Sequence, residues 1–297
     1  MLKKVIYTCI TGNYDTLGEP KEVSKGFDYI CFTDNLENCT NDGSVWQLRP
    51  LPPETEGLSN VKKQRYVKVC AHKVLPEYDI SIWVDGNIVM KNDLNSFIDT
   101  LDFNSSDVFV PQHPQRNCTY KEAVAIIQLK KADKTVVDRQ VEEYRKEGFP
   151  KDCGMLQSCI LVRKHNAPDC VKLMENWWLE IKEKCHRDQL SFNYVAWKHQ
   201  DIPVVYIPKT IFNSVWFKYV ATHTKKRSLS IKKRSLNTNK HSLNTKKSLR
   251  IEENKVWICV PNEKQQIPSR FAIPRKNHPI RPSFIVHKKA VRSKRLW

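Results

Sequence analysis

The stretch 81-SIWVDGNIV-89 decides the fold of this chain. Its apolar half runs directly into Asp85, Gly86 and Asn87, three residue types that are common in turns. A short apolar run bounded by turn residues is typical of a buried strand in an α/β sheet, and ligands of such sheets bind outside the carboxyl ends of the strands. The stretch therefore predicts a strand that carries a carboxylate and an amide to a binding edge. An Asp-Gly pair that only closes a turn is the alternative.

Strand-like and helical patterns alternate along the first three-quarters of the chain, which predicts an α/β fold with a mainly parallel central sheet. The predicted strands cover residues 4–10, 28–32, 45–48, 80–85, 107–110 and 158–162. The predicted helices cover residues 60–75, 119–129 and 134–146, with two more that begin near Pro168 and Asp188. Ser59 is the expected cap of the first helix.

Polar loops also follow the other predicted strands. The loop 11-TGNYD-15 offers Thr11 and an aromatic ring, Tyr14, that can stack on a base. Asp34 in the next loop can accept a hydrogen bond from a base or a ribose, and the loop 113-HPQR-116 follows a later strand. Each loop alone is an ordinary turn. Because the carboxyl ends of parallel strands meet at one edge, we expect the four loops to lie together.

Two helices carry further candidate residues. Arg65 and Lys68 share one face of the helix over 60–75 and could reach a pyrophosphate, for which arginine has the better geometry. An ordinary solvated helix face is the alternative. Asp188 and Gln189 stand in the first turn of another helix, where the helix dipole favours a carboxylate with or without a chemical role.

The net charge of +18 belongs to the end of the chain. Residues 225–297 contain 21 Lys and Arg against three Glu, whereas residues 1–224 contain 29 basic and 29 acidic residues. Ser-Leu pairs recur within 225–251 among basic clusters, which predicts a disordered segment, and residues 252–297 predict a basic, proline-containing tail. We expect the tail to bind an anionic membrane surface.

The ten cysteines show no C-x-x-C pair and no zinc-type clustering, which favours reduced thiols. The sequence shows neither a signal peptide before the first predicted strand nor an apolar run of membrane-spanning length. These features predict a cytoplasmic protein that is peripheral at the inner face of a membrane.

Taken together, the motifs resemble a family of bacterial and plant glycosyltransferases formerly catalogued as a domain of unknown function. The resemblance covers about residues 3–217 and rests on segments that occur in this order: 11-TGNYD-15, 32-FTD-34, 63-KQRYVK-68, 82-IWVDGN-87, 113-HPQR-116, 177-WW-178 and 187-RDQLSF-192. It implies a GT-A-like, Rossmann-like nucleotide-sugar domain over residues 1–224.

The resemblance also implies roles for individual residues. Asp85 and Asn87 stand at the metal-binding motif of GT-A enzymes, where Asn87 replaces a second acid. Mn²⁺ or Mg²⁺ dependence is therefore in doubt, because a neutral amide is the weaker ligand. His223 is a candidate third metal ligand, and Asp188 with Gln189 is expected beneath the reacting sugar, Asp188 as base or charge stabiliser. The expected nucleotide-sugar-binding residues are Thr11, Tyr14, Asp34, Arg65, Lys68, Asp85, Asn87, His113 and Arg116.

The expected function is transfer of a sugar from a nucleotide-diphosphate donor to a glycan or lipid-linked acceptor. Two alternatives stay open. One is a protein that binds nucleic acid through its basic tail, against which the neutral body has no RNA-binding motif. The other is a transferase fold kept as an inactive scaffold, which the amide at Asn87 would fit. The sequence does not indicate the sugar, the acceptor, the anomeric outcome or the oligomeric state.

Overall fold

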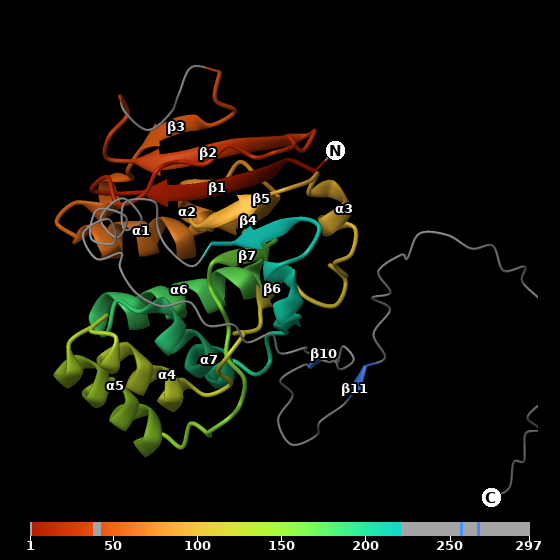
Figure 1. Ribbon diagram of the computed structural model, residues 1–297. Coiled ribbons are helices and arrows are strands. Elements are labelled where there is room, and N and C mark those ends of the chain that lie inside the picture. The colour runs from red at the N-terminus through yellow and green to blue at the C-terminus, as the bar shows by residue number, and fades with distance from the viewer. Residues whose placement is uncertain (1, 38–42, 221–255, 258–265, 268–297) are drawn as a thin grey trace, which may run out of the picture.

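The computed structural model describes residues 2–37, 43–220, 256–257 and 266–267 (Figure 1). Its centre is a seven-stranded sheet in the order β3-β2-β1-β4-β7-β6-β8. The strands are β1 (Lys4–Ile10), β2 (Phe27–Thr33), β3 (Gln47–Pro50), β4 (Ile80–Val84), β6 (Val108–Pro111), β7 (Ile160–Arg163) and β8 (Val205–Ile207). The predicted α/β class is confirmed.

The sheet is mixed and mostly parallel. The pairs β1–β2, β1–β4, β2–β3 and β6–β8 are parallel, whereas β7 is antiparallel to both β4 and β6. Six strands therefore run in one direction, and the loops after β1, β2, β4 and β6 leave the sheet at the same edge. Asp85 follows β4 at this edge.

The helices are α1 (Asn60–Val69), α2 (Ala71–Val74), α3 (Asn95–Ile98), α4 (Thr119–Gln128), α5 (Lys134–Lys146), α6 (Pro168–Glu183) and α7 (Asp188–Lys198). The predicted cap is confirmed, since the Ser59 hydroxyl accepts from the backbone N–H of Lys62. The helix predicted over 60–75 is wrong in one respect. Cys70 leaves the helical conformation, with φ −91° and ψ 46°, and divides it into α1 and α2.

Two apolar layers cover the sheet. Alternate residues of β1 point to opposite faces, so that Tyr7 packs with α1, α6 and α7, whereas Ile6 packs with α3. The second face also carries a small antiparallel pair formed by β5 (Ile88–Met90) and β9 (Phe217–Tyr219), which the sequence pattern did not predict. Figure 1 shows α4, α5, α6 and α7 gathered on one side of the sheet.

Helix α7 differs from the amphipathic helix that its sequence suggests. Leu190 and Tyr194 are buried as expected, but Gln189 and Asn193 on another face are also buried. Both amides have hydrogen-bond partners, which makes their burial tolerable. The helix is thus enclosed by the protein, and Asp188 at its start lies inside the fold.

Within the described residues, no helix is long and apolar enough to cross a membrane, and no disulfide joins the eight described cysteines. His223, the segment 225–251 and most of the tail 252–297 lie outside the described residues. Two short strands within the tail, β10 (Val256–Trp257) and β11 (Gln266–Ile267), pair in antiparallel fashion.

Candidate functional site

Lys68 forms the centre of a buried polar cluster at the binding edge of the sheet. Its Nζ lies 2.7 Å from Oδ2 of Asp188 and 3.3 Å from Oδ1 of Asp85. It also donates a hydrogen bond of 3.1 Å to the hydroxyl of Ser158, directly before β7. The lysine side chain is 1% exposed, so its charge is balanced by these carboxylates and not by water.

Asp85 is the outward-facing acid of this cluster. Its side chain is 24% exposed, against 1% for Asp188. The indole N–H of Trp83 donates to Oδ1 of Asp85 at 2.7 Å, and the same oxygen faces Lys68. Two donors thus fix one carboxylate oxygen. The second carboxylate oxygen of Asp85, Oδ2, is left for a ligand or for solvent.

Asp188 is held as a buried anion. Burial raises the pKa of its carboxyl, but the charges of Arg65, Lys68 and Arg187 outweigh burial and hold that pKa well below its usual range. Nε of Arg65 lies 3.4 Å from Oδ2 of Asp188, and the Ser158 hydroxyl donates to the same oxygen at 2.8 Å. This carboxylate stays ionised at neutral pH, which makes it a poor proton acceptor.

The loops after β1 and β2 are joined as predicted from the parallel sheet. Both carboxylate oxygens of Asp34 accept from the backbone N–H of Gly12, at 3.0 and 2.9 Å. Gly12 has φ +57°, and an added Cβ would lie 2.4 Å from the Asn60 side chain. Thr11 is buried, and its hydroxyl donates to the carbonyl of Asn60. Thr11 and Asp34 therefore shape the loop, while Tyr14 is 50% exposed beside it.

The loop after β4 is closely packed against the loop after β1. An added Cβ at Gly86 would lie 2.8 Å from the Asp15 carboxylate, so only glycine allows this approach. Asn87 is 9% exposed, and its backbone carbonyl accepts from the N–H of Val220, the residue after β9, at 2.9 Å. Among the described residues, the Oδ1 atom of Asn87 has no hydrogen-bond partner. The amide therefore keeps one buried acceptor oxygen for a ligand.

The loop after β6 is organised around a neutral histidine. Burial and the charges of Arg116 and Lys131 lower the pKa of His113 to about 4. Its Nδ1 accepts from the backbone N–H groups of Gln115 and Arg116. His113 thus acts as a loop anchor, and Arg116 forms an ion pair with the buried Glu122 of α4.

Gln189 lies on the same side of the sheet as Asp188 but contacts different groups. Its Nε2 donates to Oε1 of Gln157 at 3.0 Å and to the carbonyl of Leu156. Gln157 and Ser158 escaped the sequence analysis because they precede a strand and belong to no recognisable motif. The apolar strand that follows them, β7, does not indicate a binding role for either residue.

The residues fit a divalent cation only in part. Asp85 offers a carboxylate, and Asn87 offers the unpartnered oxygen described above. In the described part of the chain, no group of three or more His, Cys, Asp and Glu could hold a metal. Mg²⁺ is commonly bound by one or two protein oxygens together with substrate phosphates. The set therefore fits a cation that the protein shares with a bound diphosphate.

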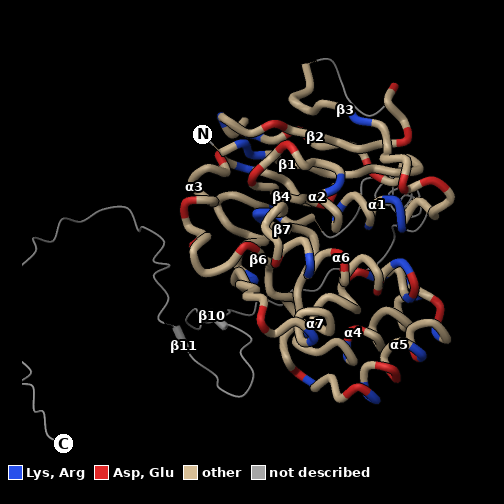
Figure 2. Tube along the Cα trace, turned by 180° about the vertical axis from the view of Figure 1, so that it is seen from behind, with Lys and Arg blue, Asp and Glu red and all other residues tan. Residues whose placement is uncertain are grey.

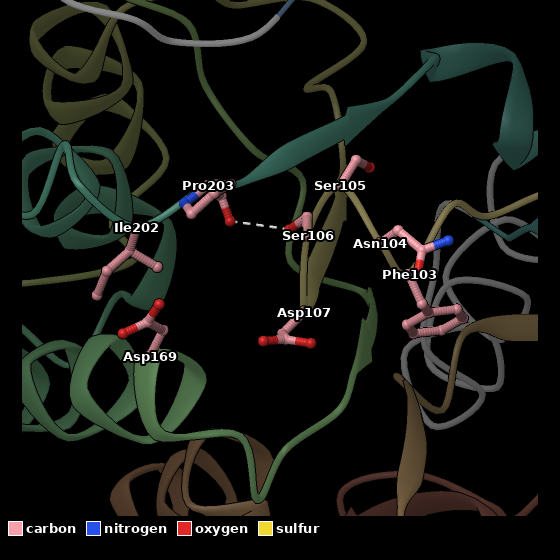
Figure 3. Close-up of a pocket in the computed structure, with 8 residues that line it drawn as sticks. All are labelled: Phe103, Asn104, Ser105, Ser106, Asp107, Asp169, Ile202 and Pro203. Atoms are coloured by element: carbon pink, nitrogen blue, oxygen red, sulfur yellow. Dashed lines mark hydrogen bonds between the residues drawn. The ribbon is translucent and has the colours of Figure 1, made fainter.

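A small pocket elsewhere lies at the opposite edge of the sheet (Figure 3). Asp107 and Pro203 line it just before β6 and β8, and Asp169 in the first turn of α6 faces them. Because these are the amino ends of the parallel strands, the pocket is separate from the cluster around Lys68. The hydroxyl of Ser106 donates to the carbonyl of Pro203 across it.

Comparison with known proteins gives a consistent result. A sequence profile of the TOD1/MUCI70 glycosyltransferase-like domain matches residues 57–241, more than half of the chain. The chain is 23% identical over 220 residues to the probable hexosyltransferase MUCI70 of Arabidopsis thaliana, across 64% of this chain and 36% of that protein. It thus spans about a third of the length of that relative.

Two glycosyltransferases are among the solved structures that align with this chain. Glycosyltransferase GlyE of Streptococcus pneumoniae TIGR4 aligns with 72% of this chain and 46% of its own, at 11% identity and a TM-score of 0.39. Mouse xyloside xylosyltransferase 1 aligns with 70% of this chain and 84% of its own, at 11% identity and a TM-score of 0.38.

Proposed function

We propose that this chain, which belongs to the TOD1/MUCI70 glycosyltransferase-like domain family, is a GT-A-type hexosyltransferase that uses a nucleotide-diphosphate sugar and a glycan or lipid-linked acceptor. The observation that carries the proposal is the bridge of Lys68 between Asp85 and Asp188 at the carboxyl edge of the sheet. A buried cation between two acids is costly to maintain. Its place at this edge favours a role in binding or chemistry over a purely structural one.

In the proposed reaction, the bond from the anomeric carbon of the sugar to the diphosphate breaks and a bond to an acceptor hydroxyl oxygen forms. The diphosphate leaves with the electron pair, and the acceptor hydroxyl releases its proton to solvent. Preorganised charge near the leaving group lowers the barrier of such a step. Lys68 and Arg65 supply fixed positive charge within the cluster, and Asp85 supplies the accessible carboxylate.

Asp188 is assigned a positioning role in this scheme. Its carboxylate is buried and remains ionised, so it does not take the acceptor proton in the arrangement observed. It holds the ammonium of Lys68 and the guanidinium of Arg65 in place. Of the two roles expected for Asp188, charge stabilisation is the one that the geometry favours.

A divalent cation is compatible with the proposal. Asp85 and Asn87 would hold it together with the donor phosphates, and it would supply further positive charge for the leaving diphosphate. Asn87 supports this arrangement because its Oδ1 has no hydrogen-bond partner among the described residues.

The first test is ligand binding by the full chain. UDP, GDP, CDP and UDP-sugars are added with and without Mn²⁺, and the melting temperature is recorded. A ligand at a hundred times its Kd stabilises the folded state by about 2.7 kcal/mol, which is readily visible. We expect one nucleotide to stabilise the protein. If this stabilisation requires Mn²⁺, the result supports Asp85 and Asn87 as ligands of the metal.

Asp85→Asn then connects binding to the site. We expect loss of donor turnover in a protein that remains folded, with a lower melting temperature because the buried Lys68 loses one of its two carboxylate partners. Asp201→Asn is the matched control, because Asp201 is an exposed acid paired with Lys172. Full turnover by Asp85→Asn, or no stabilisation by any nucleotide, would reject the proposed function.

A further inference from the structure

Three arginines from separate segments surround the start of α7. Arg187 directly precedes Asp188, and Nε of Arg65 lies 3.4 Å from that acid. Arg116 comes from the loop after β6 and pairs with Glu122 of α4. Helix α7 packs against both α4 and α6, and α6 packs in turn against α1, which carries Arg65 (Figure 2). We call Arg65, Arg116 and Arg187 the arginine cluster.

The charge of Arg187 acts on the pKa of two buried acids of this region. Burial raises the pKa of Glu122, and the charges of Arg116, Arg187 and Lys131 oppose that rise. Arg187 also lowers the pKa of Asp188. One guanidinium thus acts on both carboxylates, which ties the arginine cluster together around α7.

The acids of the region are already committed. Asp188 is shared by Lys68 and Arg65, and Glu122 is bound by Arg116. Both acids are nearly inaccessible, at 1% and 3% exposure. The three arginines remain partly exposed. The region therefore presents positive charge outward while its negative charge is enclosed.

Arg187 differs from the other two arginines of the cluster. The Nε atoms of Arg65 and Arg187 have no hydrogen-bond partner among the described residues, but Nε of Arg65 lies 3.4 Å from Oδ2 of Asp188. No ion pair within 4.0 Å is formed by Arg187 in the described part of the chain. Because the Arg187 side chain is partly exposed, its charge is available to an anion that binds from outside.

Arginine indicates the chemistry of that acceptor. Its planar fork matches the paired oxygens of a carboxylate, phosphate or sulfate, whereas lysine acts as a point charge. We propose that the arginine cluster, with Arg187 at its centre, is a subsite for an anionic group on the sugar acceptor. This inference rests on the proposed function, and it specifies the acceptor as one that carries a carboxylate, phosphate or sulfate group close to its reacting hydroxyl.

The test uses inorganic sulfate as the probe. Sulfate is titrated into the full chain against chloride at constant ionic strength, and the melting temperature is followed. We expect a saturable rise for the unsubstituted protein. Arg187→Gln should weaken sulfate binding about tenfold or more, as expected when a charged, bidentate contact is lost.

Arg49→Gln is the matched control, because Arg49 is a partly exposed arginine on β3 that pairs with Glu77. It should keep the sulfate effect. General stabilisation by sulfate acts equally on all three proteins and cancels in the comparison. An unsaturable response, or the same response in Arg187→Gln, would overturn the subsite.

A second titration distinguishes an acceptor subsite from the donor diphosphate site. Sulfate is titrated in the presence of saturating UDP. A retained sulfate effect supports a separate subsite, whereas its loss assigns the arginine cluster to the donor phosphates and overturns the inference. If UDP itself fails to bind, the proposed function fails, while the sulfate titration without UDP still reports on the arginine cluster.

Discussion

Nη2 of Arg163 donates a hydrogen bond of 2.8 Å to the backbone carbonyl of Lys68. The same carbonyl accepts from the hydroxyl of Tyr7 at 2.8 Å, and Nη1 of Arg163 donates to the carbonyl of Val69. These carbonyls belong to the last turn of α1. Backbone carbonyls in the last turn of a helix carry partial negative charge and have no hydrogen-bond partners within the helix. A buried cation on β7 thus fixes the helix that presents Lys68 to the site.

Arg163→Met should unfold more easily because it leaves two buried carbonyls without their arginine donor. We expect the free energy of unfolding to fall by about 2–4 kcal/mol in urea titrations. Arg49→Met removes a partly exposed arginine and should cost less than about 1 kcal/mol. Equal losses in the two variants would contradict the capping role of Arg163.

The local features of this fold could be predicted from sequence. The helix over 134–146 was predicted with its observed bounds, and in the structure Asp133 caps it by accepting from the backbone N–H of Val136. Strand β4 and Asp85 were equally clear, since an apolar run and a turn are contiguous. The shared edge of the loops followed from the parallel sheet and was supported by the bonds between Asp34 and Gly12.

The long-range features could not be predicted. Lys68 lies on a charged helix face that resembles a solvated surface, and its main partner is 120 residues away in the sequence. The antiparallel direction of β7 and the pairing of β5 with β9 depend equally on distant contacts. Asp188 was expected to face the substrate, but its burial results from the packing of α7 among neighbouring helices.

Asp188→Asn should change the pH dependence of stability. The pKa of Asp188 is lowered in the folded state, so its ionised form stabilises the protein above the ordinary unfolded value of about 3.9. That contribution is lost as the pH falls from this value toward the folded pKa. We expect the substitution to cost about 3–5 kcal/mol at pH 7, because Lys68 and Arg65 lose a buried partner.

The measurement is urea unfolding at a series of acidic and neutral pH values. The difference between the two proteins should shrink below about pH 4, where the wild-type carboxylate begins to take up a proton in the unfolded chain. Asp201→Asn, at an exposed acid paired with Lys172, should leave the free energy of unfolding at acidic pH nearly unchanged. A pH-independent difference for Asp188→Asn would show that the residue contributes by shape and not by charge.

Gly12→Ala and Gly57→Ala separate backbone strain from a close contact. Both glycines have positive φ, +57° and +74°, so either substitution should cost about 1 kcal/mol in backbone strain. Only at Gly12 would the new Cβ strike a neighbour, the side chain of Asn60, while nothing lies within 4 Å at Gly57. Gly12→Ala should therefore lose more stability in thermal unfolding.

The same pair tests the loop after β1 as part of the donor site. Gly12→Ala should weaken nucleotide binding, because the displaced loop carries Tyr14 and is bonded to Asp34. Gly57→Ala should bind nucleotide with the affinity of the unsubstituted protein. Unchanged affinity in Gly12→Ala would remove this loop from the proposed donor site.

Thiol reactivity should follow burial. Burial raises the pKa of Cys70 and of Cys170 to about 12, which leaves on the order of one thiolate in ten thousand at pH 8. Cys153 is the one described cysteine that is partly exposed. We expect brief iodoacetamide treatment of the native protein to modify Cys153 ahead of the other described cysteines, with mass spectrometry of peptides as the measurement.

Cys153→Ser should remove that early adduct without exposing the buried thiols. In urea, all ten cysteines of the chain should react, which provides the reference for complete modification. Early modification of Cys70 in the native protein would contradict the expectation and would show local opening where α1 meets α2. Because Cys70 directly follows the turn that Arg163 caps, Arg163→Met should speed alkylation of Cys70 more than that of Cys159, whose carbonyl accepts from the backbone N–H of Asp85.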